Sequence, residues 1–143
     1  MEQDVLLTIT SIQCFENEEP ETTQLVTPGT MRMEEDAIEL SYAETELTGL
    51  QGTQTDFRIE KERVSLRRSG AVESKMTFVI GQEDLSLYDM GFGALMINLR
   101  TEDIRCDLSE KGGTLIVAYT IVIEEEATGT IRYEIAVQPL DKG

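Results

Sequence analysis

The sequence contains no histidine and no tryptophan, and its 143 residues include only two cysteines and three prolines. Without histidine the chain cannot form a Ser–His or Cys–His pair of its own, which excludes the commonest forms of nucleophilic catalysis. Cys14 and Cys106 are far apart in the sequence, whereas a structural zinc site takes four ligands that usually come in closely spaced pairs. We therefore expect no metal, no cofactor and two reduced, partly buried thiols, with a disulfide between them as an open alternative.

Basic side chains are also scarce, because 12 Lys and Arg stand against 28 Asp and Glu, which gives a net charge of −16. Nucleic acids and anionic membranes bind clustered Lys and Arg, and the one basic-leaning segment, 58–68, is interrupted by two glutamates. We expect neither as a partner. The N-terminal MEQDVLLTIT lacks the pattern of a signal peptide, and no apolar run approaches the about 20 residues that cross a bilayer. These features predict a cytoplasmic protein, whose oligomeric state the sequence leaves open.

What the sequence does contain is alternation of apolar and polar residues, which is typical of strands with one buried face. The alternating segments are 5–9, 38–42, 57–59, 64–66, 76–80, 95–99, 104–108, 115–123 and 131–137. Short polar links at 60–63, 81–84, 109–113 and 124–129 predict antiparallel hairpins, because parallel strands need long crossovers, and 16–23 reads as a polar loop. The pattern predicts an all-β protein, with residues 1–143 forming a single-domain antiparallel meander β-barrel of about 8–10 strands.

Several polar side chains fall on the predicted inner faces of these strands. Extending each apolar face in steps of two residues adds Tyr42, Glu44, Glu46, Thr53, Thr55 and Arg68 to the interior. All of them lie near strand ends, where the mouth of a barrel would be. A buried arginine needs a partner or access to water, so we expect Arg68 to pair with the carboxylate of Glu44 or Glu46.

The chain resembles a known family in several segments that occur in the same order. These segments are YAETELTGLQGTQTDFRIE, LRRSG, KMTF, YDMGFGALMINLRT and GGTLIVAYTI, and the most specific of them is ELTGLQGTQT followed by RSG. They are similar to the YwiB-like family of small bacterial proteins of unknown function. The resemblance implies a calycin-type, lipocalin-like β-barrel, and it transfers no catalytic or binding residue.

Three functions fit the sequence, and the first hypothesis is a non-enzymatic binding module. A closed barrel can hold one small ligand at its mouth, and the residue types there favour a small polar or zwitterionic molecule. The candidate ligand-binding residues are Tyr42, Glu44, Glu46, Thr53, Thr55, Arg68 and Tyr88. The alternative is a filled barrel with a structural or protein-interaction role. The third is an enzyme that uses Glu44 and Glu46 as paired carboxylates, whose Cα atoms would lie about 6.6 Å apart on one strand.

Overall fold

The computed structural model describes residues 2–15, 18–44, 51–70, 73–89, 94–123 and 126–140, and of 86–89, 94–97, 123 and 126–127 it describes the backbone alone. Its regular structure consists of ten strands: β1 (Glu2–Phe15), β2 (Glu21–Met33), β3 (Ile38–Ala43), β4 (Thr53–Ile59), β5 (Val64–Gly70), β6 (Ser74–Phe78), β7 (Glu83–Asp89), β8 (Ala94–Ser109), β9 (Gly112–Ile123) and β10 (Glu126–Pro139). Three predicted loops are shorter than expected, since β2 begins at Glu21, β9 at Gly112 and β10 at Glu126.

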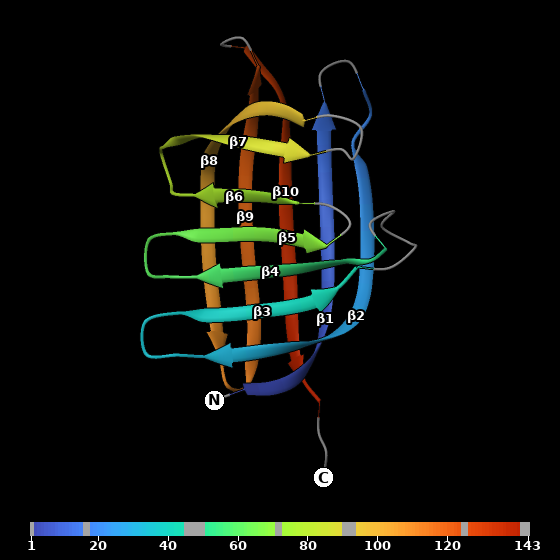
Figure 1. The fold of residues 1–143 in the computed structure, drawn as a ribbon, viewed down its shortest axis with the longest axis vertical. Coiled ribbons are helices and arrows are strands. Elements are labelled where there is room, and N and C mark those ends of the chain that lie inside the picture. Colours follow the sequence, from blue (N-terminus) through green and yellow to red (C-terminus); the bar gives the residue numbers. More distant parts are fainter. Residues whose placement is uncertain are drawn as a thin grey trace.

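The strands form a closed antiparallel barrel in which each strand pairs with its neighbours in the chain. The last strand closes the ring on the first, with Val5 opposite Pro139 and Phe15 opposite Gly129. Figure 1 shows the short strands β3 to β7, in cyan to yellow, running across the long strands β1 and β8 to β10. The predicted all-β meander barrel is therefore confirmed. No helix long and apolar enough to cross a membrane occurs among the described residues.

Two long strands, β2 and β8, bend between the direction of the short strands and the direction of the long ones. β2 pairs with β1 from Glu21 to Arg32, but it pairs with β3 only from Thr30 onward. The corner lies at Pro28–Gly29, where the backbones approach so closely that a Cβ on Gly29 would lie 2.5 Å from the carbonyl oxygen of Ser41. Only glycine tolerates this contact without a shift.

The second corner lies in β8, which the sequence predicts as two strands, 95–99 and 104–108. The structure shows one strand with a register shift between Thr101 and Asp103. Such a bulge inserts one residue, bends the strand and reverses which residues face inward. The inner face therefore passes from Leu99 and Thr101 to Ile104, whose side chain packs against the core.

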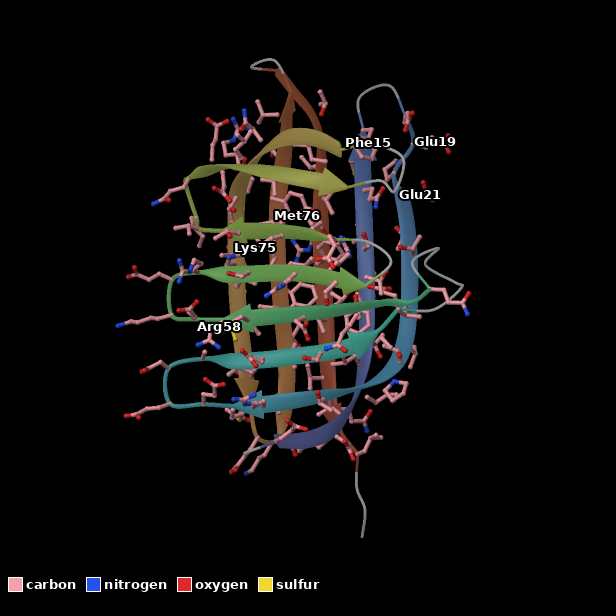
Figure 2. The ribbon with its side chains drawn as sticks, in the orientation of Figure 1. Phe15, Glu19, Glu21, Arg58, Lys75 and Met76 are labelled. Atoms are coloured by element: carbon pink, nitrogen blue, oxygen red, sulfur yellow. The ribbon has the colours of Figure 1, made fainter. Side chains whose placement is uncertain are left out.

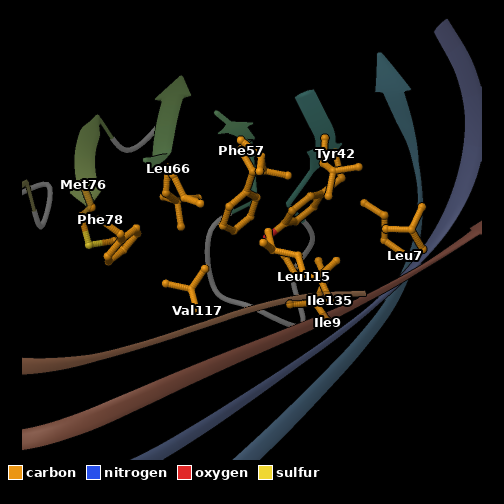
Figure 3. Packing of buried hydrophobic residues seen from close by; sticks show 14 of the residues in the cluster. Leu7, Ile9, Tyr42, Phe57, Leu66, Met76, Phe78, Leu115, Val117 and Ile135 are labelled. Atoms are coloured by element: carbon orange, nitrogen blue, oxygen red, sulfur yellow. The ribbon is translucent and has the colours of Figure 1, made fainter. Parts of the chain in front are cut away.

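The core fills the middle of the barrel with side chains from both strand layers. Figure 3 shows Phe57 and Tyr42 pointing from the short strands toward Leu115 and Ile135 of the long strands. Phe57, Leu115 and Ile135 are at most 1% exposed, and burying a side chain of this kind stabilises the fold by about 1.5–3 kcal/mol. The outer faces are polar, as in the ion pair between Arg58 and Glu39, 2.6 Å apart across β3 and β4; Arg58 is labelled in Figure 2.

Candidate functional site

A row of inward-facing polar residues crosses four strands at one end of the barrel. Tyr42 of β3 is opposite Thr55 of β4, Thr55 is opposite Arg68 of β5, and Arg68 is opposite Ser74 of β6. All four are buried, and directly opposite residues have Cβ atoms about 4.5–5.5 Å apart. Sequence reasoning missed Ser74, although extending the face of Met76 and Phe78 back by two residues would have found it.

Glu44 lies one step beyond this row and is held by it. The Thr55 hydroxyl donates a buried hydrogen bond of 2.7 Å to Oε1 of Glu44, and Glu44 itself is 6% exposed. Burial raises the pKa of the Tyr42 phenol, and the Glu44 carboxylate raises it further through its charge and a side-chain hydrogen bond. Tyr42 therefore stays protonated and available as a donor beside the carboxylate.

Arg68 is linked to the opposite side of the barrel. Burial alone would lower the pKa of its guanidinium, but electrostatic and hydrogen-bonding interactions with Tyr133, followed by electrostatic interactions with Tyr42 and Glu44, raise it overall. Tyr133 of β10 is itself fixed by aromatic contacts, with its ring centroid 6.4 Å from Phe57 and 6.3 Å from Tyr119. The guanidinium is therefore a fixed positive charge inside the barrel.

The predicted partner of Arg68 is corrected in part by this arrangement. Among the described residues, no carboxylate forms an ion pair with Arg68 within 4.0 Å. Glu44 contributes to the field at Arg68, but its closest described hydrogen bond is the one from Thr55. The alternation along each strand shows which side chains point inward. Whether Tyr133 lies close to Arg68 depends instead on how the two sides of the barrel face each other. Glu46, the other predicted partner, lies outside the described residues.

Buried polar atoms without a partner gather around these residues. Five side-chain atoms of the described residues are buried and form no hydrogen bond: Oε2 of Glu44, Nε of Arg68 and the hydroxyls of Ser11, Thr53 and Ser74. Ser11 is the register neighbour of Tyr133, and Ser74 that of Arg68. Thr53 lies on β4 on the same face as Thr55. Register pairing and the shared face of β4 therefore link all five residues to one group of neighbouring residues, which we call the Arg68 cluster: Ser11, Tyr42, Glu44, Thr53, Thr55, Arg68, Ser74 and Tyr133.

The remaining predicted site residue, Tyr88, is placed only in part. Its backbone on β7 is opposite Ser74, which puts position 88 at the edge of the Arg68 cluster, and its side chain lies outside the described residues. The described residues contain no group of three or more His, Cys, Asp or Glu that could hold a metal ion.

Both cysteines are free thiols. Cys14 is half-buried as expected, whereas Cys106 is the more exposed of the two, although its thiol is still partly desolvated. It pairs with the buried Leu115 of β9 and faces inward, but in the described part of the chain no strand pairs with this part of β8 on the side away from β9. Partial desolvation raises the pKa of the Cys106 thiol, and the Asp107 charge adds to this against a hydrogen bond from the Leu108 backbone. The thiol is thus a weak nucleophile at neutral pH.

Comparisons with known proteins agree with this fold. Residues 7–135 match the family described as "Domain of unknown function (DUF1934)". The chain is 29% identical to the "Uncharacterized beta-barrel protein YwiB" of Bacillus subtilis (strain 168) over 139 residues, which cover 94% of this chain and 96% of that protein. The crystal structure of ywiB protein from Bacillus subtilis superposes with a TM-score of 0.86 at 25% identity, covering 98% of this chain and 94% of that one. The YwiB-like resemblance is therefore confirmed.

Proposed function

We propose that this chain, which belongs to the DUF1934 family, is a non-enzymatic binding protein that holds a small polar molecule at the Arg68 cluster. The observation that carries the proposal is that all five described residues with an unpartnered buried side-chain atom belong to that one group of neighbouring residues. A buried polar group without a hydrogen bond is destabilising by about 1–3 kcal/mol. Each such group calls for a partner that the protein chain itself does not supply, such as a bound ligand or ordered water.

The chemistry of the unpartnered atoms suggests the kind of ligand. Nε of Arg68 is a donor that lacks an acceptor, and Oε2 of Glu44 is an acceptor that lacks a donor. Their charges are opposite, so a ligand of zero net charge meets the least electrostatic penalty. A zwitterion or a carboxamide carries both an acceptor and a donor within a few bonds. The hydroxyls of Thr53 and Ser74 can serve in either role.

The barrel architecture supports a ligand inside it. Up-and-down barrels of the lipocalin type hold one small molecule in their interior, and the family resemblance points to that type. Ligands usually sit where a few convergent polar groups interrupt an apolar lining. Here the Arg68 cluster lies beside apolar rings, because Tyr133 of the cluster packs against Phe57 and Tyr119.

The same rings favour the second candidate, a filled barrel with a structural or protein-interaction role. Phe78 and Tyr119 also pack together, with centroids 4.8 Å apart, so large side chains occupy much of the interior. In that case ordered water would satisfy the five atoms, since buried water typically bonds otherwise unsatisfied polar groups. The Arg68 cluster would then fix the register of the strands.

The experiment combines native mass spectrometry with a thermal-shift screen of neutral, zwitterionic and anionic metabolites. The variants are Arg68→Met and Glu44→Gln, and the control is Arg67→Gln, which removes an exposed guanidinium from the neighbouring position of β5. We expect a class of net-neutral ligands to raise Tm in the native protein and in the control. A saturating ligand at 100 times its Kd stabilises by about 2.7 kcal/mol, which shifts Tm by roughly 5 °C for a domain of this size.

The outcomes separate the two candidates. Loss of the shift in both cluster variants, with retention in Arg67→Gln, supports a ligand at the Arg68 cluster. A clean apo mass with no shift across the library favours the filled barrel, and so does a crystal structure with only water on the five atoms. A shift that survives both cluster variants would place the ligand elsewhere and contradict the proposal.

A further inference from the structure

A second feature of the barrel lies away from the Arg68 cluster, along the distal half of β8. β7 pairs with β8 only from Ala94 to Arg100, whereas β9 pairs with it as far as Ser109. The turn before β7 adds two bonds, from the N–H of Gly81 to the carbonyl of Thr101 and from the N–H of Thr101 to the carbonyl of Gln82. Among the described residues, β8 therefore has a strand neighbour on one side only beyond Thr101.

The direction of the free backbone groups follows from the alternation of an antiparallel ladder. Both backbone groups of Thr101 point to the turn, so its pair with Tyr119 of β9 is not hydrogen-bonded. Every second pair along β9 is of the same type, and these pairs are Val117 with Ile104, Leu115 with Cys106 and Gly113 with Leu108. The N–H and C=O groups of Ile104 and Cys106 therefore point away from β9, along the free edge. Those of Leu108 do so too, although its backbone N–H also bonds the Cys106 thiol.

The free edge borders an open groove of about 1040 Å³. Apolar or weakly polar side chains form its floor, namely Met33, Ile38, Ile59, Val79 and Cys106. The hairpin turns β2–β3, β4–β5 and β6–β7 also line the groove. All three lie on one side of the molecule in Figure 1, the side of β8. The exposure of Cys106, although it faces the interior, reflects this opening.

The rim of the groove is acidic. Glu34, Glu35, Asp36, Glu60 and Glu62 line it, against Lys61 and Arg63. Arg58 and Arg63 neutralise Glu34 and Glu60, but Glu35, Asp36 and Glu62 are exposed and form none of the ion pairs found within the described part of the chain. A cationic occupant would face uncompensated carboxylates here.

We infer that the free edge of β8 accepts an extended segment of a basic partner protein as an added strand. An exposed edge supplies main-chain hydrogen bonds, and the pockets beside it select alternate side chains of the guest. The segment would alternate apolar residues, directed to the floor of the groove, with Lys or Arg directed to Glu35, Asp36 and Glu62. A second copy of this chain is disfavoured as the guest, because each copy carries a net charge of −16.

The probe is a blocked nine-residue peptide of alternating Lys and Val, titrated into the ¹⁵N-labelled protein and followed by NMR. We expect shifts centred on Ile104, Cys106 and Leu108 and slower amide exchange at these residues, which in the free protein should exchange faster than Arg105 and Asp107. Two control peptides replace Lys by Glu, or carry N-methyl groups on the alternate backbone nitrogens that face β8. Neither control should bind.

Two protein variants separate the edge from the charges. Cys106→Pro removes one outward N–H, and an edge position with its N–H toward solvent tolerates proline; we expect at least tenfold weaker binding. Changing Glu35→Gln, Asp36→Asn and Glu62→Gln together should weaken binding by about tenfold at low salt. The matched control changes Glu18, Glu19 and Glu21 to Gln, none of which lines the groove. Glu19 and Glu21 lie far from Arg58 in Figure 2. That control should weaken binding much less than the groove variant does, with only a small loss from the lower net charge.

Several results would overturn the inference. They are the absence of shifts on β8 at about 1 mM peptide, equal binding of the N-methylated peptide, and equal weakening in the two charge variants. Protection of the Ile104, Cys106 and Leu108 amides that rises with protein concentration, without peptide, would assign the edge to a second copy instead. If Cys106→Pro fails to fold, the charge variants and the N-methylated peptide still decide the question.

Discussion

Thr53 and Thr55 offer a direct test of how the Arg68 cluster is assembled. Both belong to β4, both face the interior, and both are at most 2% exposed. They differ in one respect, because the Thr55 hydroxyl donates to Glu44 at 2.7 Å whereas the Thr53 hydroxyl has no partner. Substitution by valine keeps the shape of the side chain and removes only the hydroxyl. The pair Thr55→Val and Thr53→Val therefore compares a used with an unused buried hydroxyl.

The expected magnitudes follow from these contacts. A hydrogen bond to a charged group contributes about 1.5–3 kcal/mol, so Thr55→Val should lower the free energy of unfolding by about 2 kcal/mol. Thr53→Val removes a buried hydroxyl that forms no bond, so it should be neutral or stabilising by up to about 1 kcal/mol. With a urea m-value of about 2 kcal/mol/M, the two midpoints should differ by about 1 M. Urea unfolding followed by far-UV circular dichroism measures both.

A double-mutant cycle sharpens the assignment. Thr55→Val combined with Glu44→Gln should show a coupling energy of about 1 kcal/mol or more, whereas Thr53→Val with Glu44→Gln should be additive within about 0.5 kcal/mol. Equal losses in the two valine variants would refute the reasoning. They would mean that the Thr53 hydroxyl is bonded in solution, for instance by ordered water.

Two further predictions concern pH and backbone conformation. Tyr42 has a raised pKa in the folded barrel. Its contribution to the free energy of unfolding is therefore complete below a pH of about 10, the ordinary tyrosine pKa. Above that pH the unfolded chain ionises first, and urea titrations should show stability falling with pH more steeply in the native protein than in Tyr42→Phe. Gly113→Ala should destabilise by well over 1 kcal/mol, because its Cβ would collide with the Asp107 carbonyl oxygen; Gly81→Ala, with positive φ but open space, should lose only about 1 kcal/mol in the same assay.

Much of the fold is predictable because every second residue of a strand in a closed barrel faces the interior and is therefore buried. In β4 every inward residue from Thr53 to Ile59 is buried, as the alternation predicts. β2 breaks this rule, since its sequence ETTQLVTPGTMRM has no sustained alternation. The strand contacts different neighbours on either side of Pro28, with β3 joining only from Thr30. Because the two halves of β2 have different neighbours, its apolar residues do not follow one period along the whole strand, and the alternation is not detected.

The candidate site is less predictable than the fold. The alternation along each strand predicts that Glu44, Thr55 and Arg68 point into the barrel. It says nothing about which residues of different strands meet there. The link from Arg68 to Tyr133 joins β5 to β10 across the barrel. Which residues meet there depends on strand tilt and on the stagger of the whole ring, and neither is encoded in the spacing of a single segment.

The bulge in β8 shows how one local feature produces both a wrong prediction and a candidate surface. The sequence carries the signal, because the inner face shifts from odd positions at Leu99 and Thr101 to even positions at Ile104 and Cys106. Two separate strands and one bulged strand give the same change of parity, but they have opposite consequences. Two strands could each pair on both sides, whereas a bulged strand turns a corner and leaves β7 behind. The free edge, the open groove and the exposure of Cys106 all follow from that single inserted residue. If this reasoning is correct, deleting Glu102 should restore a straight strand only by moving Ile104 off the inner face, and the barrel should lose stability rather than close its groove.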